Sequence, residues 1–191
     1  MVSTSKAYAM LGNESLWEVA LHCDRVFKNA NIPHSICGGV AVCLHGYQRN
    51  TTDVDIIISS SDSAKVRELL TASLYTWDED RKEFSSPGGV AVQFLIAGER
   101  AGKDSEITIP IPEGDQNIEE RDGLSVVRLS RLIEMKIACG LGSMRRTYKD
   151  FADVVELIAI RDLDGSFCRF LHKSVRETFR ELVHRARGDN S

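Results

Sequence analysis

The chain has 191 residues, of which 42% are hydrophobic and 27% are charged, and its formal net charge is −4. It is long enough for one domain with a buried core, and its composition is that of an ordinary globular protein. The acidic balance excludes a chain that binds polyanions with its whole surface, and no apolar run approaches the roughly 20 residues that a membrane helix needs.

The cysteines indicate a reducing compartment. There are five of them, scattered along the chain without a C-x-x-C pair or a metal-finger spacing, which favours free thiols over disulfides or a zinc site. No targeting segment is visible at Met1–Met10. We therefore expect a cytoplasmic protein that does not associate with membranes.

The first part of the chain predicts a glycine turn between two strands. Apolar residues at helical spacing predict a helix over residues 14–30, and a strand is expected over residues 34–37. The glycine pair Gly38-Gly39 then turns the chain into a helix over residues 40–47. The isoleucine-rich run at residues 53–59 has the β-branched composition of a buried strand.

The middle of the chain predicts further strands around one more helix. A helix is expected over residues 64–72, and an edge strand or hairpin over residues 75–86. Residues 90–97 predict a third core strand. Residues 99–123 are irregular and contain prolines, so we expect a loop with one short strand there.

The last third of the chain changes to helical patterns. Helices are expected over residues 129–139, 149–160 and 166–187. The fold class is therefore α/β, with a small mixed sheet flanked by helices. We expect a core at residues 1–125 and a helical portion at residues 126–191 that packs on it.

Two aspartates at the start of the buried strand carry the clearest chemistry. Residues i and i+2 of a strand point to the same face, so Asp53 and Asp55 are expected to point to one spot. Two carboxylates beside the glycine backbone suit Mg²⁺ or Mn²⁺ that holds a nucleoside triphosphate. Glycine also lets the backbone approach phosphate, and a helix N-terminus favours anions. The alternative, a turn aspartate and a surface aspartate, fits poorly beside the apolar run Ile56–Ile58.

Several motifs together resemble a known superfamily. The pair Gly38-Gly39, then His45-Gly46, then the R-x-T-x-D-x-D run from Arg49 to Asp55, resembles the minimal nucleotidyltransferase signature. This version is similar to AbiEii-type nucleotidyltransferases, which include toxins of type IV toxin–antitoxin systems. Lys136, then Arg145-Arg146 and then the run Lys149–Asp153 resemble that family's lysine motif followed by its D-x-x-D motif. The resemblance covers roughly residues 33–160.

The resemblance implies a nucleotidyltransferase fold and a divalent-metal reaction. An NTP is the implied co-substrate, and its nucleoside monophosphate goes to a hydroxyl of RNA, a protein or a small molecule. The implied metal ligands are Asp53 and Asp55, and the implied catalytic residues are Asp53, Asp55, Lys136 and Asp150. The implied nucleotide-binding residues are Gly38, Gly39, Arg49, Thr51 and Lys136.

Some of these residues have an alternative structural interpretation. Lys136 lies on the apolar side of its helix, so it either reaches the surface with its ammonium group or faces a cleft and touches phosphate. Asp150 and Asp153 share one helix face. They either support the helix N-terminus and pair with Lys149, or act in the site. Arg49 either pairs with one of the two metal-binding aspartates or touches phosphate.

One position departs from the pattern of the family. Many nucleotidyltransferases place a third carboxylate on the next core strand, where this chain has Gln93. A glutamine orients a hydroxyl or a water but is neither an anionic base nor a strong metal ligand. The chemistry is then slow, or takes its base from elsewhere, with Asp150 as the candidate, or is lost. Gln93 could equally be a polar residue on an exposed sheet face.

Three functions therefore stay open: an active nucleotidyltransferase, a degenerate form that binds a nucleotide or a partner protein, and a toxin that has an antitoxin partner. No DNA-binding motif is present. His45 is expected to be a helix-end residue rather than a metal ligand, because no second histidine lies at ligand spacing. The basic residues Arg169, Lys173, Arg176 and Arg180 form either a solvated helix face or an RNA contact.

Overall fold

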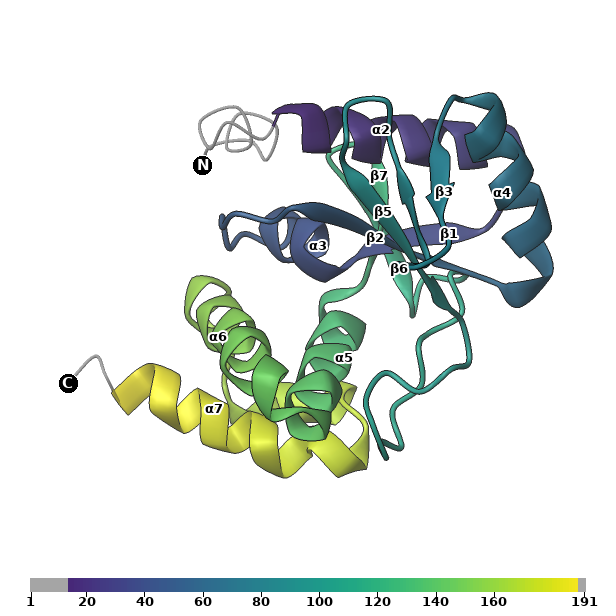
Figure 1. The fold of residues 1–191 in the computed structure, drawn as a ribbon. Coiled ribbons are helices and arrows are strands. Elements are labelled where there is room, and N and C mark those ends of the chain that lie inside the picture. The colour runs from purple at the N-terminus through teal and green to yellow at the C-terminus, as the bar shows by residue number, and fades with distance from the viewer. Residues whose placement is uncertain (1–13, 189–191) are drawn as a thin grey trace.

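The computed structural model describes residues 14–188 and builds one sheet with helices around it (Figure 1). Residues 1–13 and 189–191 lie outside the described part, and they include the Met1–Met10 segment that was inspected for a targeting signal. Among the described helices, none combines the length and the apolar character needed to span a bilayer.

The sheet has seven strands in the order β3-β4-β5-β2-β1-β7-β6. The central strand β2 runs antiparallel to β1 and parallel to β5. Its residues Ile56, Ile57 and Ile58 are buried, as the β-branched run predicted. The strand bounds are β1 His34–Cys37, β2 Asp53–Ile58, β3 Thr76–Asp78, β4 Glu83–Ser85, β5 Ala91–Ile96, β6 Ile118–Arg121 and β7 Leu124–Val127.

Helices cover the sheet from two sides. In Figure 1, α2 runs along the top of the sheet, whereas α5, α6 and α7 gather below it. The α-helix bounds are α2 Glu14–Asn29, α3 Gly38–Leu44, α4 Ser63–Ala72, α5 Leu129–Gly142, α6 Met144–Ile160 and α7 Arg176–Gly188. Three short 3₁₀ helices are η1 Ser60–Asp62, η2 Gly165–Phe170 and η3 Lys173–Val175.

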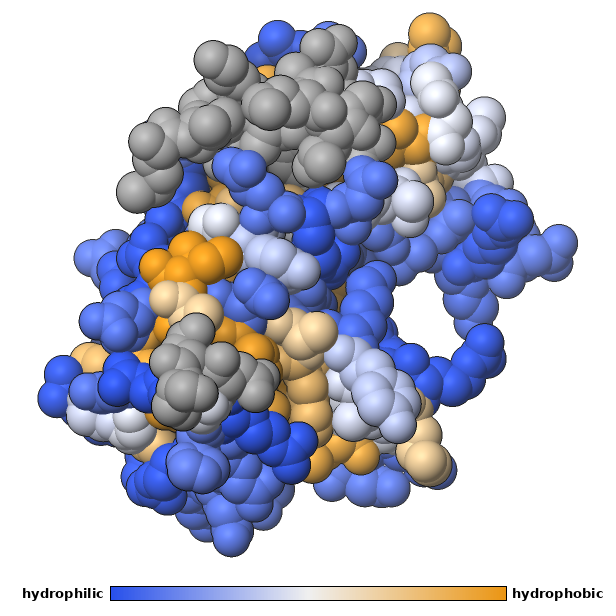
Figure 2. All heavy atoms as spheres, turned by 90° about the vertical axis from the view of Figure 1, so that its left-hand side faces the viewer, coloured by the Kyte–Doolittle hydropathy of each residue, from blue (hydrophilic) through white to orange (hydrophobic). Residues whose placement is uncertain are grey.

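Helix α5 joins two apolar clusters. Its residues Leu132 and Met135 pack in the cluster of the sheet, whereas Ile133 and Ile137 pack in the cluster of the C-terminal helices. Most apolar side chains are inside these clusters, and the face in Figure 2 is largely hydrophilic with small hydrophobic areas. The predicted boundary between residues 125 and 126 falls inside strand β7. Helix α5 can thus bring a side chain between the two clusters, as can α6, whose Leu157 packs in the first cluster and whose Ile158 packs in the second.

The prediction of one helix over residues 166–187 was wrong. The chain forms η2, η3 and α7 instead, because Leu171 and His172 have extended backbone torsions, with ψ of 151° and 144°. The carbonyl of Leu171 accepts a 2.8 Å hydrogen bond from Nε of Arg176, which stabilises this break. The four basic residues that were expected along one helix are therefore divided among three elements: Arg169 is in η2, Lys173 is in η3, and Arg176 and Arg180 are in α7.

Other elements also differ from the prediction. The helix expected over residues 40–47 begins at the glycine pair itself and ends at Leu44, and the helix expected over residues 129–139 continues to Gly142. The helix expected over residues 149–160 begins at Met144. The irregular region 99–123 does contain one strand, β6, but its hairpin partner β7 was not predicted. The expected hairpin over residues 75–86 is confirmed as β3 and β4, and the expected third core strand as β5.

Candidate active site

The glycine turn packs directly against the strand that follows it. Strands β1 and β2 pair with Cys37 opposite Asp55, which brings the next residue, Gly38, onto the Asp55 side chain. A Cβ atom at Gly38 would lie 1.7 Å from Oδ2 of Asp55, and one at Gly39 would lie 2.3 Å from Oγ1 of Thr51. Gly38 also has a φ of +60°. Only glycine fits this position, because it has no Cβ and tolerates a positive φ.

The two aspartates of β2 lie close together without a cationic partner. Oγ1 of Thr51 donates a 3.0 Å hydrogen bond to Oδ1 of Asp53. Between residues 14 and 188, neither Asp53 nor Asp55 forms an ion pair with a lysine, an arginine or a histidine. Burial, and then the charge of Asp53, raise the pKa of Asp55 to about 6. Repulsion between these two carboxylates therefore raises the free energy of the folded protein, and a bound cation would lower it.

These two carboxylates fit a divalent metal that shares its ligands with a substrate. Mg²⁺ prefers hard oxygen ligands and usually takes one or two carboxylates, together with waters and substrate phosphates. No set of three or more histidine, cysteine or acidic residues that could enclose a metal occurs within the described part of the chain. The pair thus fits an ion that arrives with a phosphate ligand better than a metal that the protein encloses alone.

Lys136 is buried between two carboxylates of α6. Its Nζ lies 2.8 Å from Oδ1 of Asp150 and 2.7 Å from Oδ2 of Asp153, and its side chain is only 7% exposed. Burial alone would lower the pKa of Lys136, but the charges of Asp153 and Asp150 outweigh burial and raise it. The ammonium group therefore stays inside the molecule in its charged form, so the interpretation in which it reaches the surface was wrong.

Arg49 connects the loop before β2 to helix α6. Its Nε and Nη2 donate hydrogen bonds of 2.6 Å and 2.9 Å to the two carboxylate oxygens of Asp153. The expected pairs of Arg49 with Asp53 or Asp55, and of Asp153 with Lys149, are therefore not formed. Such a two-bond contact fixes both side chains, since the guanidinium fork matches a carboxylate.

Asp150 also receives a second cation. Nε of Arg146 lies 3.0 Å from Oδ2 of Asp150, whose other oxygen faces Lys136. The interpretation of Asp150 as a support of the helix N-terminus was wrong, because α6 begins at Met144 and Asp150 lies beyond the first turn. Both of its oxygens therefore accept hydrogen bonds from cationic side chains.

His45 is the C-terminal cap of α3, as predicted. Its Nε2 lies 2.8 Å from the carbonyl oxygen of Val127, and burial lowers the pKa of His45 to about 4. A carbonyl only accepts, so Nε2 carries the proton of a neutral imidazole.

Gln93 lies beside Asp55 and not on a free sheet face. The two residues pair in register across β5 and β2, and Gln93 lines the cavities described next. Its Nε2 donates a 2.8 Å hydrogen bond to Oε2 of Glu83 on β4. The sequence did not single out Glu83, because its place beside Gln93 depends on the order of the strands.

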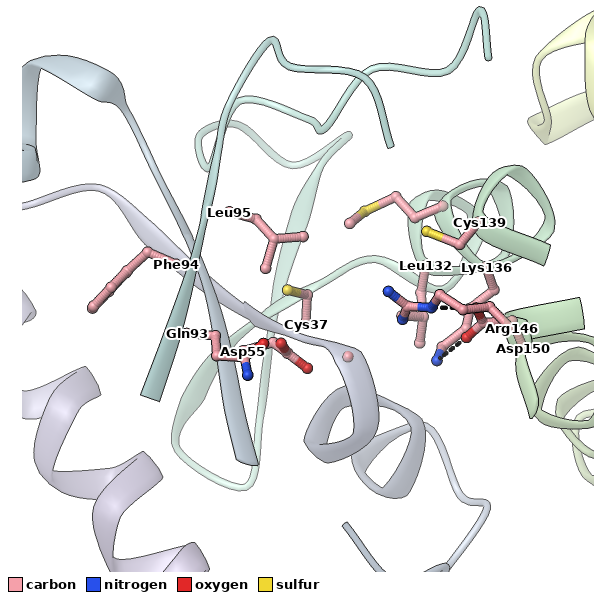
Figure 3. Close-up of a pocket in the computed structure, with 12 residues that line it drawn as sticks. Cys37, Asp55, Gln93, Phe94, Leu95, Leu132, Lys136, Cys139, Arg146 and Asp150 are labelled. Carbon is pink, nitrogen blue, oxygen red and sulfur yellow. Dashed lines mark hydrogen bonds and ion pairs between the residues drawn. The ribbon is translucent and has the colours of Figure 1, made fainter. Parts of the chain in front are cut away.

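Two adjoining cavities open between the sheet and the C-terminal helices, and Figure 3 shows the one that contains Asp150. We call the one of about 280 Å³ the polar cavity. Seven of the predicted site residues line it: Gly38, Gly39, Arg49, Thr51, Asp53, Asp55 and Lys136. The eighth, Asp150, lines the other, which we call the apolar cavity, has about 200 Å³ and includes Leu95, Leu132 and Met135.

Three basic residues of α6 complete the wall of the polar cavity. Arg145, Arg146 and Lys149 face the aspartates of β2 across it. The sequence placed them next to the D-x-x-D motif, but we gave Lys149 only the pair with Asp153 and gave Arg145 and Arg146 no role. Clustered basic residues beside a motif that resembles a phosphate-transfer site were the signal that could have identified them.

Comparisons with known proteins agree with the geometry at the level of the fold. No protein-family model matches the chain, and no curated protein matches it either. Among solved structures, the antigenic nucleotidyltransferase-like protein from Paracoccidioides brasiliensis is similar, with 17% identity, a TM-score of 0.52, and coverage of 91% of this chain and 89% of that one.

Two structures of the antibiotic-resistance factor ANT(2″)-Ia are similar as well. The solution structure is 12% identical and the complex with adenylyl-2″-tobramycin is 13% identical. Each has a TM-score of 0.49 and covers 90% of this chain, and the matches cover 92% and 97% of the two ANT(2″)-Ia chains. Together with the sheet and the helices described above, the Paracoccidioides likeness shows that this chain has the α/β nucleotidyltransferase fold.

Proposed function

We propose that the protein is a Mg²⁺- or Mn²⁺-dependent nucleotidyltransferase that moves a nucleoside monophosphate from an NTP to an acceptor hydroxyl. The observation that carries the proposal is the pair Asp53 and Asp55. Asp55 lies against Gly38, and neither aspartate forms an ion pair with a residue between 14 and 188. Metal ligation relieves the repulsion within such a pair, and the fold is consistent with this chemistry.

The charges of the polar cavity suit a metal–triphosphate. Asp53 and Asp55 would hold the ion, which when bound neutralises phosphate charge and links the triphosphate to the protein. Arg145, Arg146 and Lys149 on the opposite wall would attract the phosphate oxygens. The missing Cβ of Gly38 leaves room for the carboxylate of Asp55 to lie against the backbone of the turn.

Lys136 would contact the triphosphate with the one N–H donor of its ammonium group that Asp150 and Asp153 do not use. An ammonium group has three N–H donors, and Asp150 and Asp153 accept from two of them. Because both oxygens of Asp150 face cations, we propose that Asp150 positions Lys136 and Arg146 and does not act as the base. Arg49 would then act through Asp153 on the same lysine.

In the proposed reaction, the acceptor oxygen bonds to the α-phosphorus as the bond from that phosphorus to the bridging oxygen breaks. Pyrophosphate leaves, and the hydroxyl proton passes to solvent. The acceptor can be RNA, a protein or a small molecule. The resemblance to AbiEii-type proteins adds the proposal of a toxin with an antitoxin partner, whose expression would arrest growth.

Gln93 favours a second function, a nucleotide- or partner-binding module without turnover. Its amide stands next to Asp55, where a carboxylate would strengthen metal binding. Such a module would bind the metal–NTP complex but would transfer nothing.

Labelled NTPs incubated with the protein, Mg²⁺ or Mn²⁺, bulk RNA and a cell extract test these proposals. We expect transfer of label that is abolished in Asp55→Asn and kept in Asp162→Asn, which changes a side chain that is 98% exposed. NTP binding in calorimetry without transfer to any acceptor would favour the binding module. No NTP binding at all would overturn both functions.

For the toxin proposal, the wild-type chain and the variants Asp55→Asn and Asp162→Asn are each expressed in growing cells. Growth arrest that depends on Asp55 supports it, and normal growth with the wild-type chain contradicts it.

A further inference from the structure

Three side chains on neighbouring strands form a row that leads into the candidate site. Asp55 on β2 pairs with Gln93 on β5. On the other side of β5, Phe84 pairs with Val92 and Ser85 with Ala91 in an antiparallel register, so Glu83 continues that register opposite Gln93. Paired residues of adjacent strands point to the same face of a sheet. The row therefore ends at the carboxylate proposed to bind metal.

Glu83 determines which end of the Gln93 amide faces the cavity. Oε2 of Glu83 accepts the hydrogen bond from Nε2 of Gln93 at 2.8 Å, and its Oε1 lies 3.6 Å from Nη1 of Arg81. The Glu83 side chain is 12% exposed. An ionised carboxylate only accepts hydrogen bonds, so the amide nitrogen must face it. The amide oxygen of Gln93 is therefore the group that remains to face the two cavities, both of which Gln93 lines.

The negative charge of Glu83 also makes that amide oxygen a better acceptor. A hydrogen bond to a charged group is stronger than a neutral one, and neighbouring hydrogen bonds polarise each other. With a neutral residue at position 83, the amide could turn over and present its nitrogen to the cavity instead. A donor beside Asp55 would compete for that carboxylate.

From this geometry we infer that Glu83 is a positioning residue that holds the amide oxygen of Gln93 toward the site, where it accepts the hydrogen bond of the acceptor hydroxyl. This inference rests on the proposed function. In this role, Gln93 orients the hydroxyl so that its oxygen lone pairs face the phosphorus, and it removes no proton. Gln93 would thus take part in the reaction although it has an amide where a carboxylate was expected.

Exchanging the two residues tests the inference in the full chain. Glu83→Gln keeps the shape and can keep the hydrogen bond, but it loses the charge that fixes the amide. We expect kcat for label transfer to fall about fivefold to tenfold with an unchanged KM for NTP, as expected for the loss of one charge-assisted contact. Gln93→Glu alone replaces the hydrogen bond between positions 83 and 93 with two carboxylates that repel each other, and it is expected to be impaired as well.

The double variant carries both changes and is the decisive measurement. The amide at position 83 can donate to the carboxylate at position 93, which again holds an oxygen acceptor beside Asp55. We expect its kcat to return to within about threefold of the wild-type value, above either single variant. Because the exchange keeps the hydrogen bond and the volume, this variant also answers the question if a single variant fails to fold.

A matched control removes the same charge from the same hairpin. Glu79→Gln changes a side chain that is 79% exposed and pairs with Arg67, away from Gln93, and we expect wild-type kinetics. A Glu83→Gln variant with wild-type kcat, or a double variant no better than the singles, would overturn the inference alone. A wild-type chain that transfers nothing would overturn the proposed function, and with it this inference.

Discussion

Two pairs of aspartates lie near the two cavities, and their surroundings are opposite. Asp53, Asp55 and Asp150 line a cavity, whereas Asp153 contacts Arg49 and Lys136, which line the polar cavity. Asp53 and Asp55 lie on a strand and have no cationic partner between residues 14 and 188. Asp150 and Asp153 lie on α6, are at most 1% exposed, and receive Lys136 together with two arginines. Asp150 and Asp153 are compensated by ion pairs, whereas Lys136, Arg146 and Lys149 act on Asp55 only through longer-range attraction.

This difference separates a binding element from a structural one. Buried carboxylates that meet cations at hydrogen-bond distance hold elements together, and removing one partner leaves an uncompensated charge. Carboxylates forced together without a cation destabilise the fold unless something else binds there. Four predictions follow from this contrast.

The largest effect is expected in the compensated pair. Asp153→Ala leaves Lys136 and Arg49 without their shared carboxylate, so we expect a loss of about 3–5 kcal/mol in the free energy of unfolding. Urea unfolding measures it. Glu79→Ala, which breaks an exposed pair, should cost less than about 1 kcal/mol. A loss in Asp153→Ala as small as that of the control would contradict the assignment of a structural role.

The opposite sign is expected in the uncompensated pair. Because the folded-state pKa of Asp55 is raised to about 6, the folded protein holds more protons than the unfolded one between about pH 4 and 6, and stability falls as pH rises through this window. Asp55→Asn removes this loss and should stabilise the metal-free protein by about 2 kcal/mol above pH 7.

Thermal unfolding from pH 4 to 8 measures this difference. The gain from Asp55→Asn should shrink toward pH 4, because the wild-type carboxyl is then protonated in the folded state and becomes protonated in the unfolded state as well. Asp162→Asn, at a 98% exposed position, should show no such trend. A destabilised Asp55→Asn variant at neutral pH would mean that the wild-type carboxylate is already compensated.

A smaller effect is expected on metal affinity. A proton competes with the cation for Asp55, so the affinity for Mn²⁺ should fall about tenfold between pH 7 and pH 5. Titration of the free ion at both pH values measures the change. Affinity that stays constant over this range would show that Asp55 does not ligate the ion.

The smallest effect is expected where a partner is exposed. The side chain of Arg146 is 58% exposed, and Asp150 keeps Lys136 when this arginine is removed. Arg146→Gln should therefore cost at most about 1 kcal/mol of unfolding free energy. A loss above about 2 kcal/mol would mean that the arginine, and not the lysine, compensates Asp150.

Local patterns were enough to predict the central part of the fold. The run Ile56–Ile58 and the pair Gly38-Gly39 each act within a few residues, so the buried strand and the turn before it could be predicted. Strand β7 was missed because four residues are too few to show a period. The dipeptide Asp122-Gly123 was a usable signal, since both residues have the positive φ of a hairpin turn, +48° and +82°.

The candidate site was predictable only where neighbours in sequence are neighbours in space. Asp53 and Asp55 satisfy this condition through the alternation of a strand. The contact of Arg49 with Asp153 spans 104 residues, and the sequence contains no signal for it. The contact of Gln93 with Glu83 spans only 10 residues, but it requires β4 to lie beside β5, which the sequence of a short polar segment does not reveal.

The long contact between Arg49 and Asp153 has a consequence for the nascent chain. Synthesis proceeds from the N-terminus, so the ribosome releases the glycine pair and both strand aspartates long before it adds the residue that holds Arg49. A polypeptide that stops before residue 153 would contain the complete G-G and D-x-D motifs. Arg49, in the loop before β2, would then lack the carboxylate that holds it. The wall that holds Lys136 is thus completed only when the last third has been translated and has docked.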